Sequence, residues 1–142
     1  MAVMGDTAEA AFLELHPEAH RLGLSRPAFA VQATPVNLRY APDFALQTGA
    51  YEVMGFSSRG NKCLKLKLEK ARSLMSWALL VPTYLWVWDS AKRRYWEAPI
   101  DYWIDACDRN AERLFFEDNL KPYWNLGLEH FPCEPTSVTA AA

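Results

Sequence analysis

The segment Arg39-Tyr-Ala-Pro-Asp-Phe-Ala-Leu-Gln-Thr-Gly-Ala-Tyr-Glu-Val-Met-Gly55 has the pattern of two short strands joined by a turn. Apolar residues favour extended structure on both sides of Gln47-Thr-Gly49, which is a turn-forming triplet. Pairing of the two strands would bring Asp43 and Glu52 close together. Two converging carboxylates repel each other unless a cation lies between them, and hard oxygen ligands suit Mg²⁺. The segment therefore indicates a metal-dependent hydrolase.

The rest of the chain alternates predicted helices and strands. Apolar residues at helical spacing predict helices, and runs of aromatic and β-branched residues predict strands. The run over 83–88 is continuous, which is typical of a strand covered on both faces and predicts the centre of the sheet. The expected elements are a helix over 6–15, a short strand over 29–32, a helix over 62–80, strands over 83–88 and 95–98, and a helix from 99 or 101 to 113. At the start of the 62–80 helix, Leu64-Lys-Leu-Lys-Leu68 also alternates with the period of a strand. This order predicts an α/β fold with a central mixed β-sheet flanked by helices.

Length and composition fit one globular domain. The chain has 142 residues, of which 51% are hydrophobic and 13% aromatic, with six tryptophans. A chain of this size buries about two thirds of its unfolded surface, which excludes intrinsic disorder as the main state. We expect a single domain over residues 1–132 and a flexible tail over 133–142, where Pro, Ser, Thr and three alanines gather.

The cysteines and the amino-terminal segment indicate a cytoplasmic protein. Cys63, Cys107 and Cys133 are odd in number and widely spaced, so they predict neither a zinc site nor a disulfide framework. We expect no membrane partner, because no apolar run reaches the ~18 residues that span a bilayer and residues 1–6 lack the pattern of a signal peptide.

Three short motifs in order resemble the PD-(D/E)XK nuclease superfamily. They are Gly5-x-x-x-Glu9 in the first predicted helix, Pro42-Asp-Phe44, and Tyr51-Glu-Val-x-Gly55. Their spacing and flanking residues look most like the phage-type endonuclease I Holliday-junction resolvases, over roughly residues 5–96. The resemblance implies a restriction-endonuclease-like fold and a Mg²⁺- or Mn²⁺-dependent endonuclease for DNA, including branched DNA. It also implies a homodimer in the cytoplasm of a bacterial or phage-infected cell.

The resemblance also implies roles for the carboxylates. It makes Asp43 and Glu52 metal ligands and catalytic residues, and it gives Glu9 a metal or outer-shell role. The residues themselves leave two alternatives open for Glu9, because it lies one turn before Phe12: its carboxylate either approaches the core side or is a surface charge.

Position 54 departs from the superfamily pattern, since Met54 stands where the pattern has a lysine beside the attacking water. A thioether neither donates a proton nor stabilises negative charge. In one interpretation the lysine role has moved to the following segment, where Lys65 and Lys67 are the candidates. In the other, the protein is a catalytically inactive nuclease-fold protein that binds nucleic acid or another protein.

A basic segment follows the carboxylates. Six Lys and Arg side chains lie between residues 59 and 72, although the formal charge of the chain is −2. We expect Arg59, Lys62 and Lys70 to contact the DNA backbone, and the alternative is a solvated helix face without a ligand.

Overall fold

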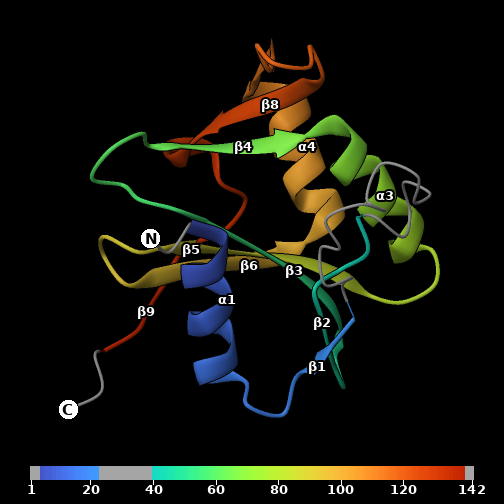
Figure 1. The fold of residues 1–142 in the computed structure, drawn as a ribbon, viewed down its shortest axis with the longest axis vertical. Helices are drawn as coiled ribbons and strands as arrows, with labels where there is room; N and C mark the ends of the chain where they lie inside the picture. Colours follow the sequence, from blue (N-terminus) through green and yellow to red (C-terminus); the bar gives the residue numbers. More distant parts are fainter. Residues whose placement is uncertain (1–3, 23–39, 140–142) are drawn as a thin grey trace.

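Residues 4–22 and 40–139 are described by a computed structural model of the chain, whose helices and strands are labelled in Figure 1. The first half contains α1 (Met4–Leu15), β1 (His20–Arg21), β2 (Phe44–Leu46), β3 (Gly49–Phe56), β4 (Cys63–Lys67) and α3 (Leu68–Ala78). The second half contains β5 (Thr83–Asp89), β6 (Arg94–Pro99), α4 (Ile100–Asn110), β7 (Glu112–Phe115), β8 (Pro122–Gly127), the 3-10 turn η2 (Leu128–His130) and β9 (Thr136–Ser137).

The larger sheet is mixed, as the sequence predicts. Within the described residues it has six strands in the order β1-β2-β3-β5-β6-β9. β3 and β5 are parallel, and the other neighbours are antiparallel. β5 lies between β3 and β6, and its leucine, valine and tryptophans are buried, which confirms the predicted central strand.

The predicted hairpin over 39–55 is confirmed as β2 and β3. Phe44 pairs with Tyr51 and Leu46 pairs with Gly49 around a tight turn. Gly49 has φ +147°, and a Cβ at this position would overlap the carbonyl of Pro82, so this tight approach to the segment before β5 requires glycine.

Helices cover both faces of this sheet (Figure 1). Phe12 of α1 packs in one apolar cluster with Tyr51, Val53 and Trp86. The opposite face carries a second cluster, which contains residues of α3 and α4 and includes Leu74, Leu85, Ile100 and Trp103. The α/β class with helices on both faces is therefore confirmed.

The predicted helix over 62–80 is wrong in its first third. Residues 63–67 form β4, and the helix begins at Leu68. Leu64 and Leu66 are buried while the lysines between and after them are not, so burial follows the two-residue period of a strand. β4 pairs with β8 in a second sheet of order β4-β8-β7, and that long-range pairing is not visible in local spacing.

The C-terminal region adds strands that the sequence does not predict. α4 ends at Asn110, three residues before the expected end, and β7 and β8 follow in the second sheet. Thr136 and Ser137 pair with β6, so part of the expected tail belongs to the large sheet. The strand expected over 29–32 lies outside the described residues. No helix in the described part of the chain is long and apolar enough to cross a membrane.

Candidate functional site

The β2–β3 hairpin places the two predicted carboxylates next to each other. Phe44 lies opposite Tyr51 in the antiparallel register, so Asp43 lies opposite Glu52, one step beyond the last paired residues. Residues directly opposite in an antiparallel pair have Cβ atoms about 5 Å apart and share a face of the sheet. The predicted meeting of Asp43 and Glu52 thus follows from the register that the apolar residues set.

Asp43 is a partly buried carboxyl held by the backbone. Its Oδ2 accepts a hydrogen bond of 2.9 Å from the Val53 N–H, and its own carbonyl accepts one of 2.8 Å from the Leu22 N–H. Burial and then the charge of Glu52 raise the Asp43 pKa to about 8, although the Val53 hydrogen bond opposes this rise. Asp43 therefore keeps its proton at neutral pH unless a cation compensates for the charge.

Glu52 is the deeper of the two carboxylates, with only 4% of its surface exposed. Its Oε2 lies 2.9 Å from Nζ of Lys70, a residue of the first turns of α3. Its other oxygen, Oε1, is buried and accepts no hydrogen bond from any of the described residues. A buried carboxylate oxygen without a donor is costly, and a cation at this position would satisfy it.

Lys70 supplies the cation of the cluster. It lies on the face of α3 that also presents Ser73, whose hydroxyl donates to the Tyr40 carbonyl at 3.2 Å, and this contact holds α3 against the segment before β2. Burial lowers the Lys70 pKa. The charge and hydrogen bond of Glu52, followed by the charge of Asp43, raise it by more than burial lowers it, so the net change is upward. The ammonium therefore stays charged at neutral pH.

The structure gives the predicted lysines different places. Lys70, which the sequence assigned to the DNA backbone, pairs with Glu52. Lys67 has its Nζ 5.8 Å from the centre of the Tyr40 ring, which also lies 5.9 Å from Nζ of Lys70. Lys65 lines an open pocket together with Met54, the position that lacks the motif lysine. Met54 lies on the same side of β3 as Glu52 because successive strand residues alternate.

Glu9 stands at the edge of the cluster. It extends from α1, and its Oε1 accepts a hydrogen bond of 2.8 Å from Arg21 of β1. Its charge is one of the weaker influences that raise the Asp43 pKa. Glu9 is therefore near enough to influence Asp43, and its own charge is balanced by Arg21. This position fits an outer-shell role better than the role of a direct metal ligand.

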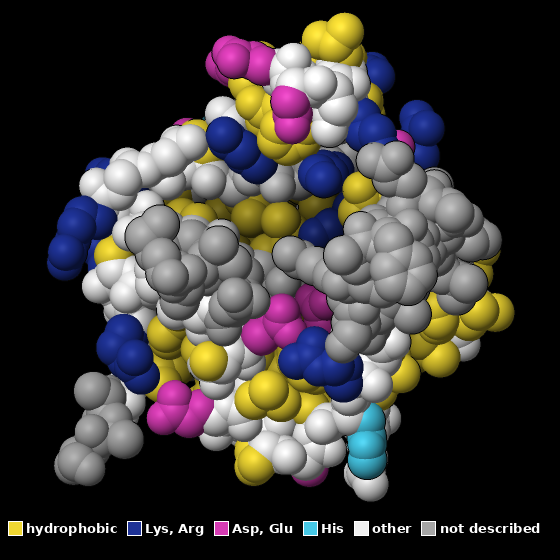
Figure 2. Space-filling view, in the orientation of Figure 1, with side chains coloured by type: hydrophobic (Ala, Val, Ile, Leu, Met, Phe, Trp, Pro, Cys, Tyr) yellow, Lys and Arg dark blue, Asp and Glu magenta, His cyan; other side chains and the backbone are white. Residues whose placement is uncertain are grey.

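Arg59 and Lys62 lie in the exposed connection between β3 and β4. Seen from the side on which α1 lies, acidic side chains form a patch near the centre of the surface, with Lys and Arg side chains on two sides of it (Figure 2). The described residues contain no group of three or more His, Cys, Asp or Glu side chains arranged to hold a metal ion. The cluster beside Lys70 contributes two carboxylates, those of Asp43 and Glu52.

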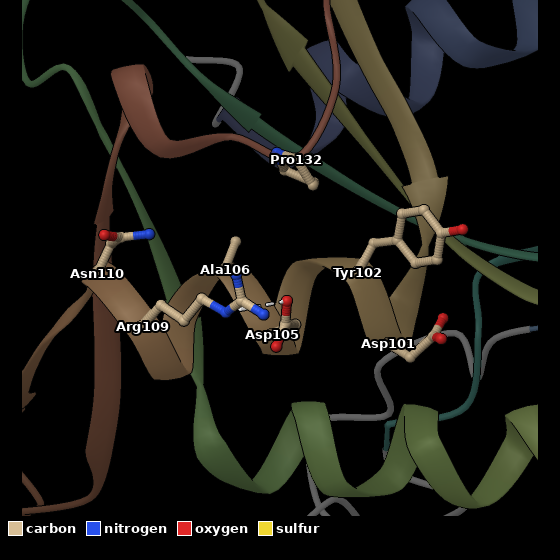
Figure 3. A pocket seen from close by; sticks show the side chains of 7 residues that line it. All are labelled: Asp101, Tyr102, Asp105, Ala106, Arg109, Asn110 and Pro132. Atoms are coloured by element: carbon tan, nitrogen blue, oxygen red, sulfur yellow. Dashed lines mark ion pairs between the residues drawn. The ribbon is translucent and has the colours of Figure 1, made fainter.

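A pocket apart from the carboxylate cluster is lined by side chains of α4 and by Pro132 (Figure 3). Arg109 forms an ion pair of 3.4 Å with Asp105 there, and both side chains are largely exposed. None of the predicted site residues lines it, so this pocket is separate from the carboxylate cluster.

Comparisons of this chain with protein-family models, with curated proteins and with solved structures find no match. A function for the protein is therefore inferred from the geometry of the cluster of Asp43, Glu52 and Lys70.

Sequence reasoning did not find the contact between Lys70 and Glu52. The signal was present, because Lys70 precedes Ser73 and Leu74 by three and four residues, and such residues share a helix face. Both Ser73 and Leu74 are buried. A lysine on the buried side of a helix needs an anionic partner.

Proposed function

We propose that this protein is a divalent-metal-dependent endonuclease that hydrolyses phosphodiester bonds in DNA. The observation that carries the proposal is the ion pair of 2.9 Å between Lys70 and Glu52, beside Asp43. Lys70 would supply, from a helix, the lysine that the nuclease pattern has and that this chain lacks at position 54. A lysine beside two carboxylates on adjacent strands supports the proposal, because the resemblance implies these side chains together with a helix glutamate, for which Glu9 is the candidate.

The donor set suits Mg²⁺ or Mn²⁺. Asp43 and Glu52 present carboxylate oxygens, and one of these, Glu52 Oε1, is buried with no hydrogen-bond donor among the described residues. Mg²⁺ binds through one or two carboxylates and keeps several waters, so two ligands from the chain are sufficient. When bound, the metal would supply polarisation of a phosphate oxygen and acidify a water molecule.

The chain's own residues then have distinct tasks. Asp43 would hold the cation as a carboxylate after release of its proton to water, since its pKa of about 8 reflects burial and the negative charge of Glu52. Lys70 keeps its proton, because its neighbours raise its pKa. Lys70 would thus act as a hydrogen-bond donor that stabilises negative charge on the reacting phosphate, and not as a base.

The basic residues around the cluster fit contacts with the DNA backbone. Arg59 and Lys62 are exposed in the connection that leaves β3, the strand that carries Glu52. Contacts of this kind are screened by salt, so affinity should fall steeply as ionic strength rises. Action on branched DNA and a homodimeric state are further parts of this proposal, and both are implied by the resemblance to resolvases.

The test is cleavage of supercoiled plasmid, linear duplex and four-way-junction oligonucleotides in Mg²⁺, Mn²⁺ or EDTA. We expect cleavage in Mg²⁺ or Mn²⁺ only, and a loss of at least ~100-fold in rate for Asp43→Asn and for Lys70→Met. Lys92→Met is the matched control for the lysine, because Lys92 is exposed in the turn between β5 and β6. Binding of DNA without any nicking in either metal would exclude the enzyme.

The second candidate is a nuclease-fold protein that binds nucleic acid or another protein without cutting. One observation favours it: Glu52 already has a cationic partner in Lys70, and the described residues hold no larger cluster of potential ligands. The cleavage assay, run beside a DNA-binding measurement, separates the two candidates, because this one predicts no cleavage and equal binding in Mg²⁺ and in EDTA.

A further inference from the structure

β4 presents two lysines on one face of the second sheet. Leu64 and Leu66 are buried in the core, while Lys65 is exposed and Lys67 is half-buried on the opposite side. Residues two apart on a strand are about 7 Å apart, which is close to the spacing of successive phosphates along a nucleic-acid strand.

Both ammonium groups lie against aromatic rings. Lys65 Nζ is 5.7 Å from the centre of the Tyr123 ring, and Lys67 Nζ is 5.6 Å from that of Phe116. The Phe116 and Tyr123 rings are themselves in contact, with centroids 4.2 Å apart. Cation–π contacts of this kind attract the ammonium groups toward the rings.

Carboxylates of the described residues do not balance the charges of these two lysines. Among the side chains described in residues 7–22 and 40–139, none of the ion pairs includes Lys65 or Lys67. By contrast, Lys70 pairs with Glu52 and Lys121 pairs with Glu69. Within this part of the chain, Lys65 and Lys67 are therefore neighbouring cations with no directly paired carboxylate, which favours an anionic ligand.

The lysine face leads directly to the carboxylate cluster. Lys67 and Lys70 lie 5.8 and 5.9 Å from the same ring, that of Tyr40, and Lys70 reaches Glu52. Figure 2 shows Lys and Arg side chains, interspersed with hydrophobic ones, extending away from the acidic patch on this face. A strand bound along β4 would thus enter the site next to Lys70.

We propose that the outer face of β4 binds a single-stranded segment of DNA and guides it to the carboxylate cluster. The guidance of the strand to the cluster rests on the proposed endonuclease function, and the substrate is then DNA with an unpaired strand. Lys65 and Lys67 would contact successive phosphates. Phe116, whose side chain is half-buried, would stack on a base in place of the Lys67 ammonium, which would move from the ring to a phosphate. Unpaired bases expose the flat faces that such rings need, whereas bases in a duplex stack on each other.

The test measures binding in EDTA, so that it does not depend on cleavage. Fluorescence anisotropy would compare a labelled oligo-dT of about 15 nucleotides, a size that one such surface covers, with a duplex of equal length and with an abasic oligomer. The variants are Lys65→Gln/Lys67→Gln and Phe116→Leu, with Lys92→Gln as the matched control, and thermal unfolding checks that each is folded.

We expect the single strand to bind at least ~10-fold more tightly than the duplex or the abasic oligomer. The double lysine variant should lose ~10-fold or more in affinity. The slope of the logarithm of its binding constant against the logarithm of salt concentration should be shallower by about 1.4, the value for two phosphates of a single strand. Phe116→Leu should lose ~5-fold or more without a change in salt dependence. Lys92→Gln should bind like the wild type.

Equal affinity for single strand and duplex would overturn the inference, and so would a double lysine variant that binds like Lys92→Gln. The two proposals fail separately. A protein that binds single strands through these residues but never cuts supports this surface and excludes the endonuclease. A protein that cuts in Mg²⁺ with no preference for unpaired strands supports the endonuclease and excludes this binding surface.

Discussion

Without metal, the Asp43→Asn variant should be more stable than the wild type, and its advantage in the free energy of unfolding should grow as the pH rises. Asn has the shape of a protonated Asp, and its side-chain oxygen accepts the same hydrogen bond from the Val53 N–H. The substitution therefore keeps the local contacts and removes only the ability to ionise. Any difference in pH dependence then reports on the Asp43 carboxyl.

The sign follows from proton binding. The Asp43 pKa is raised from 3.8 to about 8 in the folded protein, so between these values the native state keeps a proton that the unfolded state releases. The free energy of unfolding of the wild type therefore falls with rising pH over this range, by up to about 1.4 kcal/mol for each pH unit. Above a pH of about 8 the effect is complete. The Asn variant lacks this contribution.

The expected size is a few kcal/mol. From about pH 5 to about pH 8 the single-site limit is about 4 kcal/mol, and coupling of Asp43 to Glu52 and Lys70 reduces this to about 2 to 4 kcal/mol. For a chain of this length that corresponds to a gap in Tm that widens by about 6 to 12 °C. Asp118→Asn is the matched control, because Asp118 is exposed.

The assay is thermal or urea unfolding in EDTA at a series of pH values, followed by tryptophan fluorescence. Parallel pH profiles for the wild type and Asp43→Asn would refute the reasoning, since they would mean that Asp43 ionises as readily in the folded as in the unfolded chain. A second arm adds Mg²⁺ or Mn²⁺ near pH 8. The metal should raise the Tm of the wild type and leave that of Asp43→Asn almost unchanged, because it binds the ionised carboxylate.

Three further predictions concern other parts of the fold. Asp89→Ala should lower the free energy of unfolding by about 2 to 4 kcal/mol in urea titrations, because the fully buried Asp89 carboxylate accepts bonds from two backbone N–H groups and from Arg94; a loss below about 1 kcal/mol would contradict this. Gly49→Ala should cost about 3 kcal/mol or more by the same measurement, since the added Cβ meets the Pro82 carbonyl and φ is +147°. Gly60→Ala should change stability little, because its Cβ would make only an ordinary contact of 4.0 Å with the Ser57 carbonyl. Cys107, whose pKa is raised to about 12 by burial, should resist alkylation near pH 8 in the native protein and react in urea; rapid native labelling of Cys107, identified by peptide mass, would show that the helix opens.

Local patterns were sufficient where burial follows from the residues of the element itself and a partner strand is adjacent in sequence. The β2–β3 hairpin and β5 were predictable because apolar residues and a turn triplet set their register and burial. The pairing of Asp43 with Glu52 followed from that register. β4 was not predictable in the same way, because its strand conformation is set by pairing with β8, about 60 residues later in the chain.

The sequence by itself determined that two carboxylates meet on a hairpin of an α/β domain, since this depends on neighbours within a few residues. Only the tertiary structure decided which cation joins them. The packing of α3 on the sheet brings Lys70 to Glu52, while the two-residue period of β4 turns Lys65 and Lys67 to its outer face. Spacing along the chain does not distinguish these lysines, because their roles depend on the register between distant elements and on the burial that this register creates.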